Sequence, residues 1–123
     1  DLHEQAIAAW KEAGLLATAR SAYPEALAHF SRGLEALLAL PDTSDRVQHE
    51  LALRISMRPA LAVTQGYASD ELGRVLARCR ELCEQLGESP QFAAVLASLQ
   101  GYYIVRAEYT SALEASEELL HLA

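Results

Sequence analysis

Two short stretches of the sequence begin like the zinc-binding helix of a metalloprotease. They are His3-Glu4-Gln5-Ala6-Ile7 and His49-Glu50-Leu51-Ala52-Leu53. In His-Glu-x-x-His, the two histidines stand one turn apart on one helix face and bind zinc together. Both stretches carry an aliphatic residue in place of the second histidine, and a single histidine per turn cannot form the site. His29 and His121 also lack a ligand at helical spacing, so we expect no metal site.

Cys79 and Cys83 are four residues apart, which places both cysteines on one helix face. A regular helical turn seldom gives the short Cα separation and the convergent Cβ directions of a disulfide. We therefore interpret them as two small buried apolar residues. The alternative is a metal or redox role, which requires further ligands nearby. Reduced thiols favour a cytoplasmic location.

The sequence contains no motif for catalysis or for nucleotide binding. Neither a Gly-x4-Gly-Lys-Ser/Thr loop nor a Gly-x-Ser-x-Gly elbow occurs. The formal net charge of -7 predicts repulsion from nucleic acid and from anionic lipid. No apolar run approaches the ~20 residues that a membrane-spanning helix needs. We expect a non-enzymatic protein without a cofactor, and we expect it to bind neither nucleic acid nor membranes.

The hydrophobic pattern is that of amphipathic helices. Apolar residues recur at i, i+3, i+4 and i+7 between the turn signals, and nothing alternates with the period of two expected for strands. The length of 123 residues, 51% of them hydrophobic, suits one domain with its own core. Turn residues divide the chain at 21–24, 40–43, 65–69, 86–90 and 107–110. We predict an all-α domain over residues 1–123, with six helices paired into three hairpins at about 2–40, 43–87 and 89–123.

The middle of each predicted hairpin holds a tyrosine. Tyr23, Tyr67 and Tyr109 are 44 and 42 residues apart, which is a period typical of helical repeats. One hairpin cannot bury its own apolar face, whereas stacked hairpins bury it against each other. We therefore expect three stacked hairpins.

The first hairpin resembles a tetratricopeptide repeat. The residues that carry the resemblance are Trp10, Gly14, Tyr23, Ala26, Phe30, Gly33 and Leu34, all at the spacing of that motif. The third hairpin keeps Gly101, Tyr109 and Ala112. The resemblance implies a right-handed α-solenoid in which these residues pack the helices together.

The second hairpin is the most divergent of the three. It keeps Tyr67, and a shift of two residues aligns Leu72 with Ala26 and Leu76 with Phe30. Its first helix contains Pro59, which removes one backbone hydrogen bond. We expect a kink there, because the apolar pattern continues beyond it, and a broken helix is the alternative.

The amino-acid sequence of the whole chain is similar to that of the tetratricopeptide-like region of large bacterial signalling proteins. Examples are LPDTSDRVQHELALRI, VTQGYASDEL and LGESPQFAAVLASLQGYYIVRAEY. In those proteins, a class III adenylate or guanylate cyclase or a kinase domain precedes an AAA-type ATPase, and the repeats follow. The chain begins without Met and ends within its pattern, so we expect a piece of such a protein. The resemblance implies a scaffold for protein–protein interaction in signal transduction, or a sensor arm that binds a small-molecule effector and controls the attached ATPase.

The first helices of the hairpins are expected to line an inner groove that binds a protein or a peptide, including other domains of the same parent protein. The groove residues predicted by analogy are Lys11, Leu15, Arg54, Arg58, Gln100 and Tyr103. Lys11 matches the carboxylate clamp of some tetratricopeptide proteins, but Leu15 stands where that clamp has Asn, so that function is not carried over. Exposed end helices predict self-association.

The charged residues of the middle region are expected to lie on a solvated helix face. Arg74 and Arg78 share that face. Glu71 and Glu81 are close enough along the helix to pair with them.

Overall fold

The computed structural model describes residues 2–87 and 90–122. These residues form six α-helices and one short 3-10 helix, and no strand occurs among them. The elements are α1 (Leu2–Ala19), α2 (Tyr23–Ala36), η1 (Leu37–Ala39), α3 (Ser44–Gln65), α4 (Asp70–Leu86), α5 (Phe92–Val105) and α6 (Tyr109–Leu122). The predicted all-α class and the six helices are confirmed for the described part of the chain.

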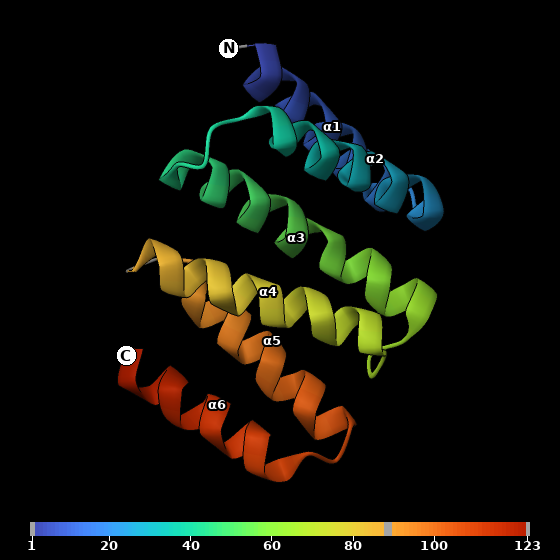
Figure 1. Cartoon of the computed structure of the whole chain (residues 1–123). Helices are drawn as coiled ribbons and strands as arrows, with labels where there is room; N and C mark the ends of the chain where they lie inside the picture. The colour runs from blue at the N-terminus through green and yellow to red at the C-terminus, as the bar shows by residue number, and fades with distance from the viewer. Residues whose placement is uncertain (1, 88–89, 123) are drawn as a thin grey trace.

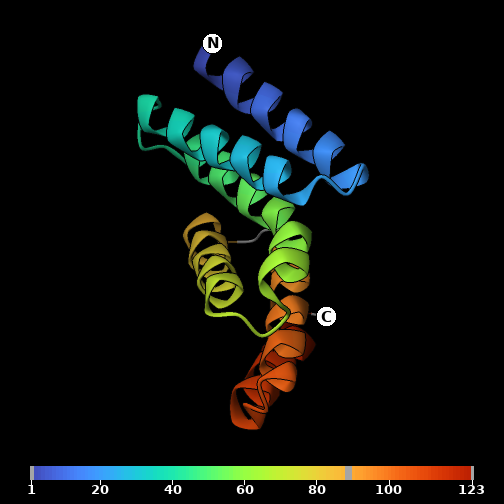
Figure 2. The same ribbon diagram turned by 90° about the vertical axis from the view of Figure 1, so that its right-hand side faces the viewer.

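Each helix packs mainly against its neighbours along the chain. α1 pairs with α2, α3 with α4 and α5 with α6, while contacts between α2 and α3 and between α4 and α5 join the pairs. α1 and α2 lie at one end of the molecule and α6 lies at the other (Figure 1). In the view turned by 90°, α4 stands to one side of α3 and α5 (Figure 2).

The first and third pairs of helices are joined by the same kind of turn. Ser21 and Ala107, each two residues before a repeated tyrosine, both have a φ of 59°. In each turn, the next backbone N–H reaches back five residues, from Ala22 to the carbonyl of Ala17 and from Glu108 to that of Tyr103, at 2.8 Å in both cases. This is the hydrogen bond of a Schellman motif, which ends a helix with a left-handed residue. The turns before Tyr23 and Tyr109 therefore share one backbone conformation.

The turn between α3 and α4 is built differently. Gly66, just before Tyr67, has a φ of 106°, which glycine adopts without strain. Two residues after Tyr67, the Ser69 side chain accepts a hydrogen bond from the backbone N–H of Leu72 at 3.2 Å and so caps α4. The second hairpin, the most divergent in sequence, therefore also departs from the other two in its turn.

Small residues let α1 and α2 approach closely. A Cβ atom built on Gly14 would lie 2.6 Å from Cζ and 2.7 Å from Cδ1 of Phe30, which is completely buried. A Cβ on Gly33 would meet Leu53 of α3 at 3.0 Å. Ala26 is also fully buried. These four signature residues of the first hairpin pack as predicted.

The remaining signature residues differ in burial. The ring of Trp10 stacks on His29 at 5.7 Å, and Tyr23 and Leu34 pack half-buried against the core. Ala112 of α6 is buried, as are Leu72 and Leu76 of the second hairpin. These residues contribute to the packing between helices, as predicted.

Three signature residues do not have the packing role predicted for them. Tyr67 and Tyr109 are 65% and 67% exposed, and no atom lies within 4 Å of a Cβ built on Gly101. Tyr109 begins α6, which buries only Ala112 and Ala115 of its described residues. Tyr67 lies in the turn after Gly66 and lines a cavity between α3 and α5. Gly101 lies on a wall of the same cavity.

Pro59 lies within a continuous helix. α3 runs from Ser44 to Gln65 without interruption, so the helix does not break at the proline. Pro59 has no N–H to donate to the carbonyl of Ile55. Its ring lies at the surface, on the same cavity as Gly101.

The core is one cluster of buried apolar side chains that extends from Ile7 of α1 to Tyr102 of α5. α6 buries only Ala112 and Ala115 of its described residues. The end of the molecule at α6 is therefore covered by little of the chain itself, and Leu113 and Leu120 are 60% and 76% exposed there.

Candidate functional site

A cluster of charged side chains joins α3 to α4. The carboxylate of Glu50 accepts hydrogen bonds from Nε of Arg54 at 2.7 Å and from Nε of Arg78 at 2.8 Å. Burial by itself raises the pKa of Glu50, but the bonds from Arg78 and Arg54 outweigh it, so the pKa lies below the ordinary value of 4.5. Glu50 is therefore ionised at neutral pH, and the cluster holds two helices together.

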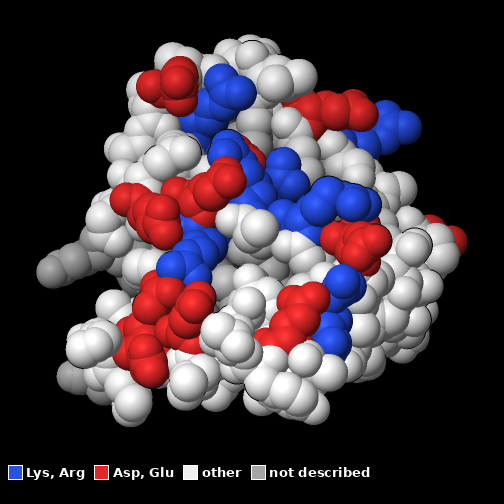
Figure 3. Space-filling model, turned by 60° about the horizontal axis from the view of Figure 1, so that its bottom comes forward, with Lys and Arg blue, Asp and Glu red and all other residues white. Residues whose placement is uncertain are grey.

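The charge pairs predicted along α4 are confirmed. Arg74 binds Glu71 at 2.7 Å and Arg78 binds Glu81 at 3.0 Å. On the face shown in Figure 3, basic and acidic side chains lie next to one another in the same way. Most arginines of α3 and α4 are thus neutralised by carboxylates within the chain.

The structure does not bring the six predicted groove residues together on one surface. Arg54 is held by Glu50. Gln100 donates from Nε2 to the Ser116 hydroxyl at 2.6 Å, so it faces α6. Tyr103 lies on the far side of α5, with Arg74 and Arg106.

Only Arg58 of the predicted set lines the largely apolar cavity between α3 and α5. Lys11 and Leu15, both on α1, lie outside this cavity. The side chains of one helix point in all directions around its axis, so spacing along α1, α3 and α5 could not decide which residues share a face in space.

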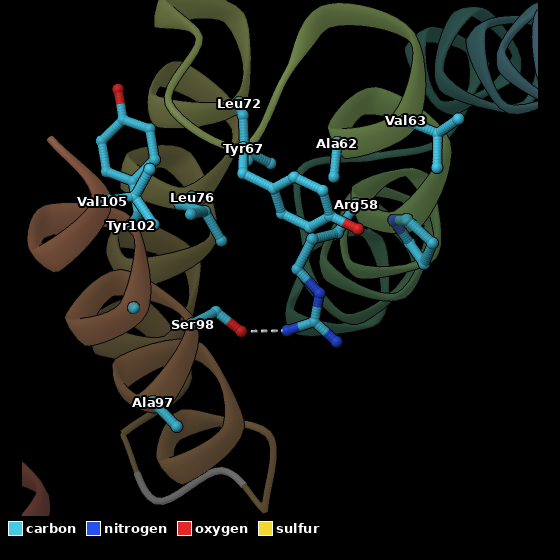
Figure 4. A pocket seen from close by; sticks show the side chains of 12 residues that line it. Arg58, Ala62, Val63, Tyr67, Leu72, Leu76, Ala97, Ser98, Tyr102 and Val105 are labelled. Atoms are coloured by element: carbon cyan, nitrogen blue, oxygen red, sulfur yellow. Dashed lines mark hydrogen bonds between the residues drawn. The ribbon is translucent and has the colours of Figure 1, made fainter.

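The cavity has a volume of about 430 Å³ and lies between α3 and α5, with α4 as its floor (Figure 4). Leu72 and Leu76 of α4 form the buried base. The walls are Arg58, Pro59, Ala62 and Val63 of α3, Tyr67 of the following turn, and Ala97, Ser98, Gly101, Tyr102 and Val105 of α5. A concave, mostly apolar space of this size with a few polar groups is typical of small-molecule sites.

Arg58 is the one charged residue in this lining. Its guanidinium extends from α3 towards α5, where Nη1 donates to the hydroxyl of Ser98 (Figure 4). The Ser98 hydroxyl in turn donates to the carbonyl of Ala94 at 2.9 Å. Among the described residues, no carboxylate pairs with Arg58. The cavity therefore combines apolar walls with a cation that no described carboxylate neutralises.

Sequence reasoning missed the contact between Gly73 and Tyr102, which fixes α4 against α5. A Cβ on Gly73 would lie 2.7 Å from Cζ of Tyr102, and the Tyr102 hydroxyl donates to the carbonyl of Ser69 at 3.0 Å. A glycine inside a strongly periodic helix usually marks a packing or functional constraint. That signal was present in the sequence at Gly73.

Both cysteines are buried, as predicted. Burial raises the pKa of the Cys79 thiol to about 11. A thiol in this state is a poor nucleophile at neutral pH, because the thiolate is the reactive form.

The described residues contain no group of three or more His, Cys, Asp and Glu side chains placed to hold a metal ion. Within residues 2–87 and 90–122, no helix has both the length and the apolar character needed to cross a membrane. Comparisons with protein-family models, with curated proteins and with solved structures found no match for this chain.

Proposed function

We propose that the chain is a tetratricopeptide-like, right-handed α-solenoid of three hairpins that serves as a protein–protein interaction module without catalytic activity. The support for the repeat architecture is the packing of helices in chain order and the shared turn before Tyr23 and Tyr109. The resemblance to signalling proteins suggests that the module is a scaffold in a bacterial ATPase or cyclase regulator, and that its partner is another domain of that protein.

The observation that carries this proposal is the exposed apolar face of α6. Tyr109, Leu113 and Leu120 are each at least 60% exposed, and their spacing places them along one side of the helix. In a repeat protein, an apolar outer face of a helix is covered by further protein. Exposed apolar side chains along one side of α6 mark such a contact site.

Photo-crosslinking tests this proposal. A benzophenone amino acid replaces Leu113 in the complete parent protein in cells, and the matched control carries it at Ala28, an exposed residue of α2. We expect a product at position 113 that mass spectrometry assigns to one protein, to one domain of the parent or to a second copy. The change Leu120→Glu should weaken this product. Equal labelling at positions 113 and 28 would contradict the proposal.

The cavity supports a second candidate function, the sensing of a small-molecule effector. Its volume of about 430 Å³ lies within the range of ligand pockets. Its walls belong to α3, α4 and α5, so a bound molecule would contact two hairpins at once and stabilise their packing. A ligand that binds only the folded chain raises its melting temperature. The matched control is Gly101→Leu, which places a side chain into the cavity, and this variant should lose the response.

A further inference from the structure

The α3–α5 cavity has the chemistry of a receptor for a molecule with two distinct parts. Its base and most of its walls are hydrocarbon, from Leu72 and Leu76 of α4 to Ala62 of α3 and Val105 of α5 (Figure 4). Burial of each methylene group against such walls favours binding by about fourfold. The body of the ligand is therefore apolar.

The other part of the ligand is defined by Arg58. A guanidinium has five N–H donors in a fixed plane, and the structure assigns one donor nitrogen of Arg58 to the Ser98 hydroxyl. Arg54, one turn earlier on α3, differs because Glu50 already neutralises it. Arg58 thus holds its donors beside the cavity, and no carboxylate in residues 2–87 and 90–122 pairs with them. A planar anion with two oxygens matches these donors.

We propose that the cavity binds a small monocarboxylate with a flexible aliphatic body, such as a medium-chain fatty acid. The carboxylate forms two parallel hydrogen bonds with Arg58, whose plane is held by Ser98, and the chain lies over Leu72 and Leu76. This inference deepens the effector-sensing candidate and rests on it.

Two observations favour this ligand over other anions and over a peptide. Arg58 is the one charged residue in the cavity lining. Its single positive charge balances the one negative charge of a carboxylate but not the two charges of a phosphate monoester. The cavity ends within three helices, and Lys11 and Leu15 of α1 are not part of it. An extended peptide running along the first helices of the hairpins would need that surface.

Titration calorimetry with saturated carboxylates from hexanoate to dodecanoate, below their micelle concentrations, tests the inference on the wild-type chain. The affinity should rise by about fourfold per methylene until the cavity is full and then level off. The alcohol of the same length should bind about tenfold or more weakly, because hydrogen bonds to charged groups are stronger than neutral ones.

Variants locate the two parts of the ligand. Arg58→Gln should reduce the affinity for carboxylates to the level of the affinity for alcohols. The affinity for alcohols should not change. The matched control is Arg74→Gln, which removes a guanidinium of α4 that lies outside the cavity and should change neither affinity. Gly101→Leu should abolish binding of both ligands. A Cβ there has nothing within 4 Å, and a far-UV circular dichroism spectrum equal to that of the wild type should show that the variant folds.

Three outcomes would overturn the inference. In the first, the wild type binds carboxylate and alcohol with equal affinity, and Gly101→Leu binds neither. This result would support a ligand site in the cavity but would exclude the role of Arg58. Binding of carboxylates that Gly101→Leu does not affect would place them elsewhere on the protein. Absence of binding by every probe would remove this inference, while the effector-sensing function would then be decided by a thermal-shift screen with other metabolites. The comparison of carboxylate with alcohol uses only the wild-type chain. It therefore tests the inference even if Arg58→Gln fails to fold.

Discussion

The contact between Gly14 and Phe30 gives the sharpest prediction for the stability of the fold. In Gly14→Ala, the new methyl carbon would lie 2.6 Å from Cζ of Phe30, whereas carbon atoms in contact are about 3.5–4.0 Å apart. The ring must therefore move by about 1 Å, and Phe30 is completely buried, so it moves against other core atoms. Overpacking of this kind costs about 1–3 kcal/mol.

The same substitution also improves the helix. Alanine stabilises a helix interior by about 1 kcal/mol relative to glycine. The two effects together predict that Gly14→Ala lowers the free energy of unfolding by about 0–2 kcal/mol. Gly14→Leu should cost more, because a longer side chain meets the same ring.

Gly101→Ala is the matched control. Gly101 also lies inside a helix, but a Cβ there has no atom within 4 Å. Only the helix effect remains, and it should raise the free energy of unfolding by about 0.5–1 kcal/mol. The difference between the two variants isolates the cost of overpacking, about 1–3 kcal/mol.

Urea unfolding followed by far-UV circular dichroism measures both variants. In a Phe30→Leu background, where the ring is absent, Gly14→Ala should lose most of its cost. Equal stabilisation by the two alanines would refute the close packing of α1 against α2.

Three further predictions concern other elements of the fold. Glu50→Gln should lower the free energy of unfolding by about 1–3 kcal/mol at neutral pH. The pKa of Glu50 in the folded state lies below 4.5. The contribution of ionised Glu50 to the free energy of unfolding is therefore present above pH 4.5 and is lost as the pH falls through that folded-state pKa. Urea unfolding of wild type and variant should give the same free energy in acid. A thiol reagent at mildly alkaline pH should label Cys79 only as fast as the chain unfolds, because the residue is 1% exposed and the reagent cannot reach it in the folded chain. Rapid labelling of the native chain would contradict its burial. Ala107→Gly should raise the melting temperature, because Ala107 has a φ of 59° that costs alanine about 1 kcal/mol. The same change at Ala115, inside α6, should lower it.

Much of the fold was readable from the sequence because helices depend on local spacing. The apolar period, the prolines and the turn residues placed all six helices, and the repeated tyrosines marked the middle of each hairpin. Gly14, Ala26, Phe30 and Gly33 were identified as packing residues because their spacing fits two helices that touch along their length. Pro59 was expected to kink its helix rather than break it, because the apolar pattern continued past it; α3 does continue through Pro59, and the kink stays a prediction.

The cavity was not readable in this way. Arg58 and Ser98 are 40 residues apart in the chain, and they meet because α4 holds α3 and α5 at a fixed distance. The sequence named Arg58 together with five residues that the structure places elsewhere, and it predicted packing for Tyr67 and Gly101, both of which line the cavity. Helical periodicity specifies which residues share a stripe on one helix. The angle and separation of two helices depend on the side chains packed between them, such as Tyr102 on Gly73. That angle and separation decide which side of each helix faces the core and which side faces the cavity.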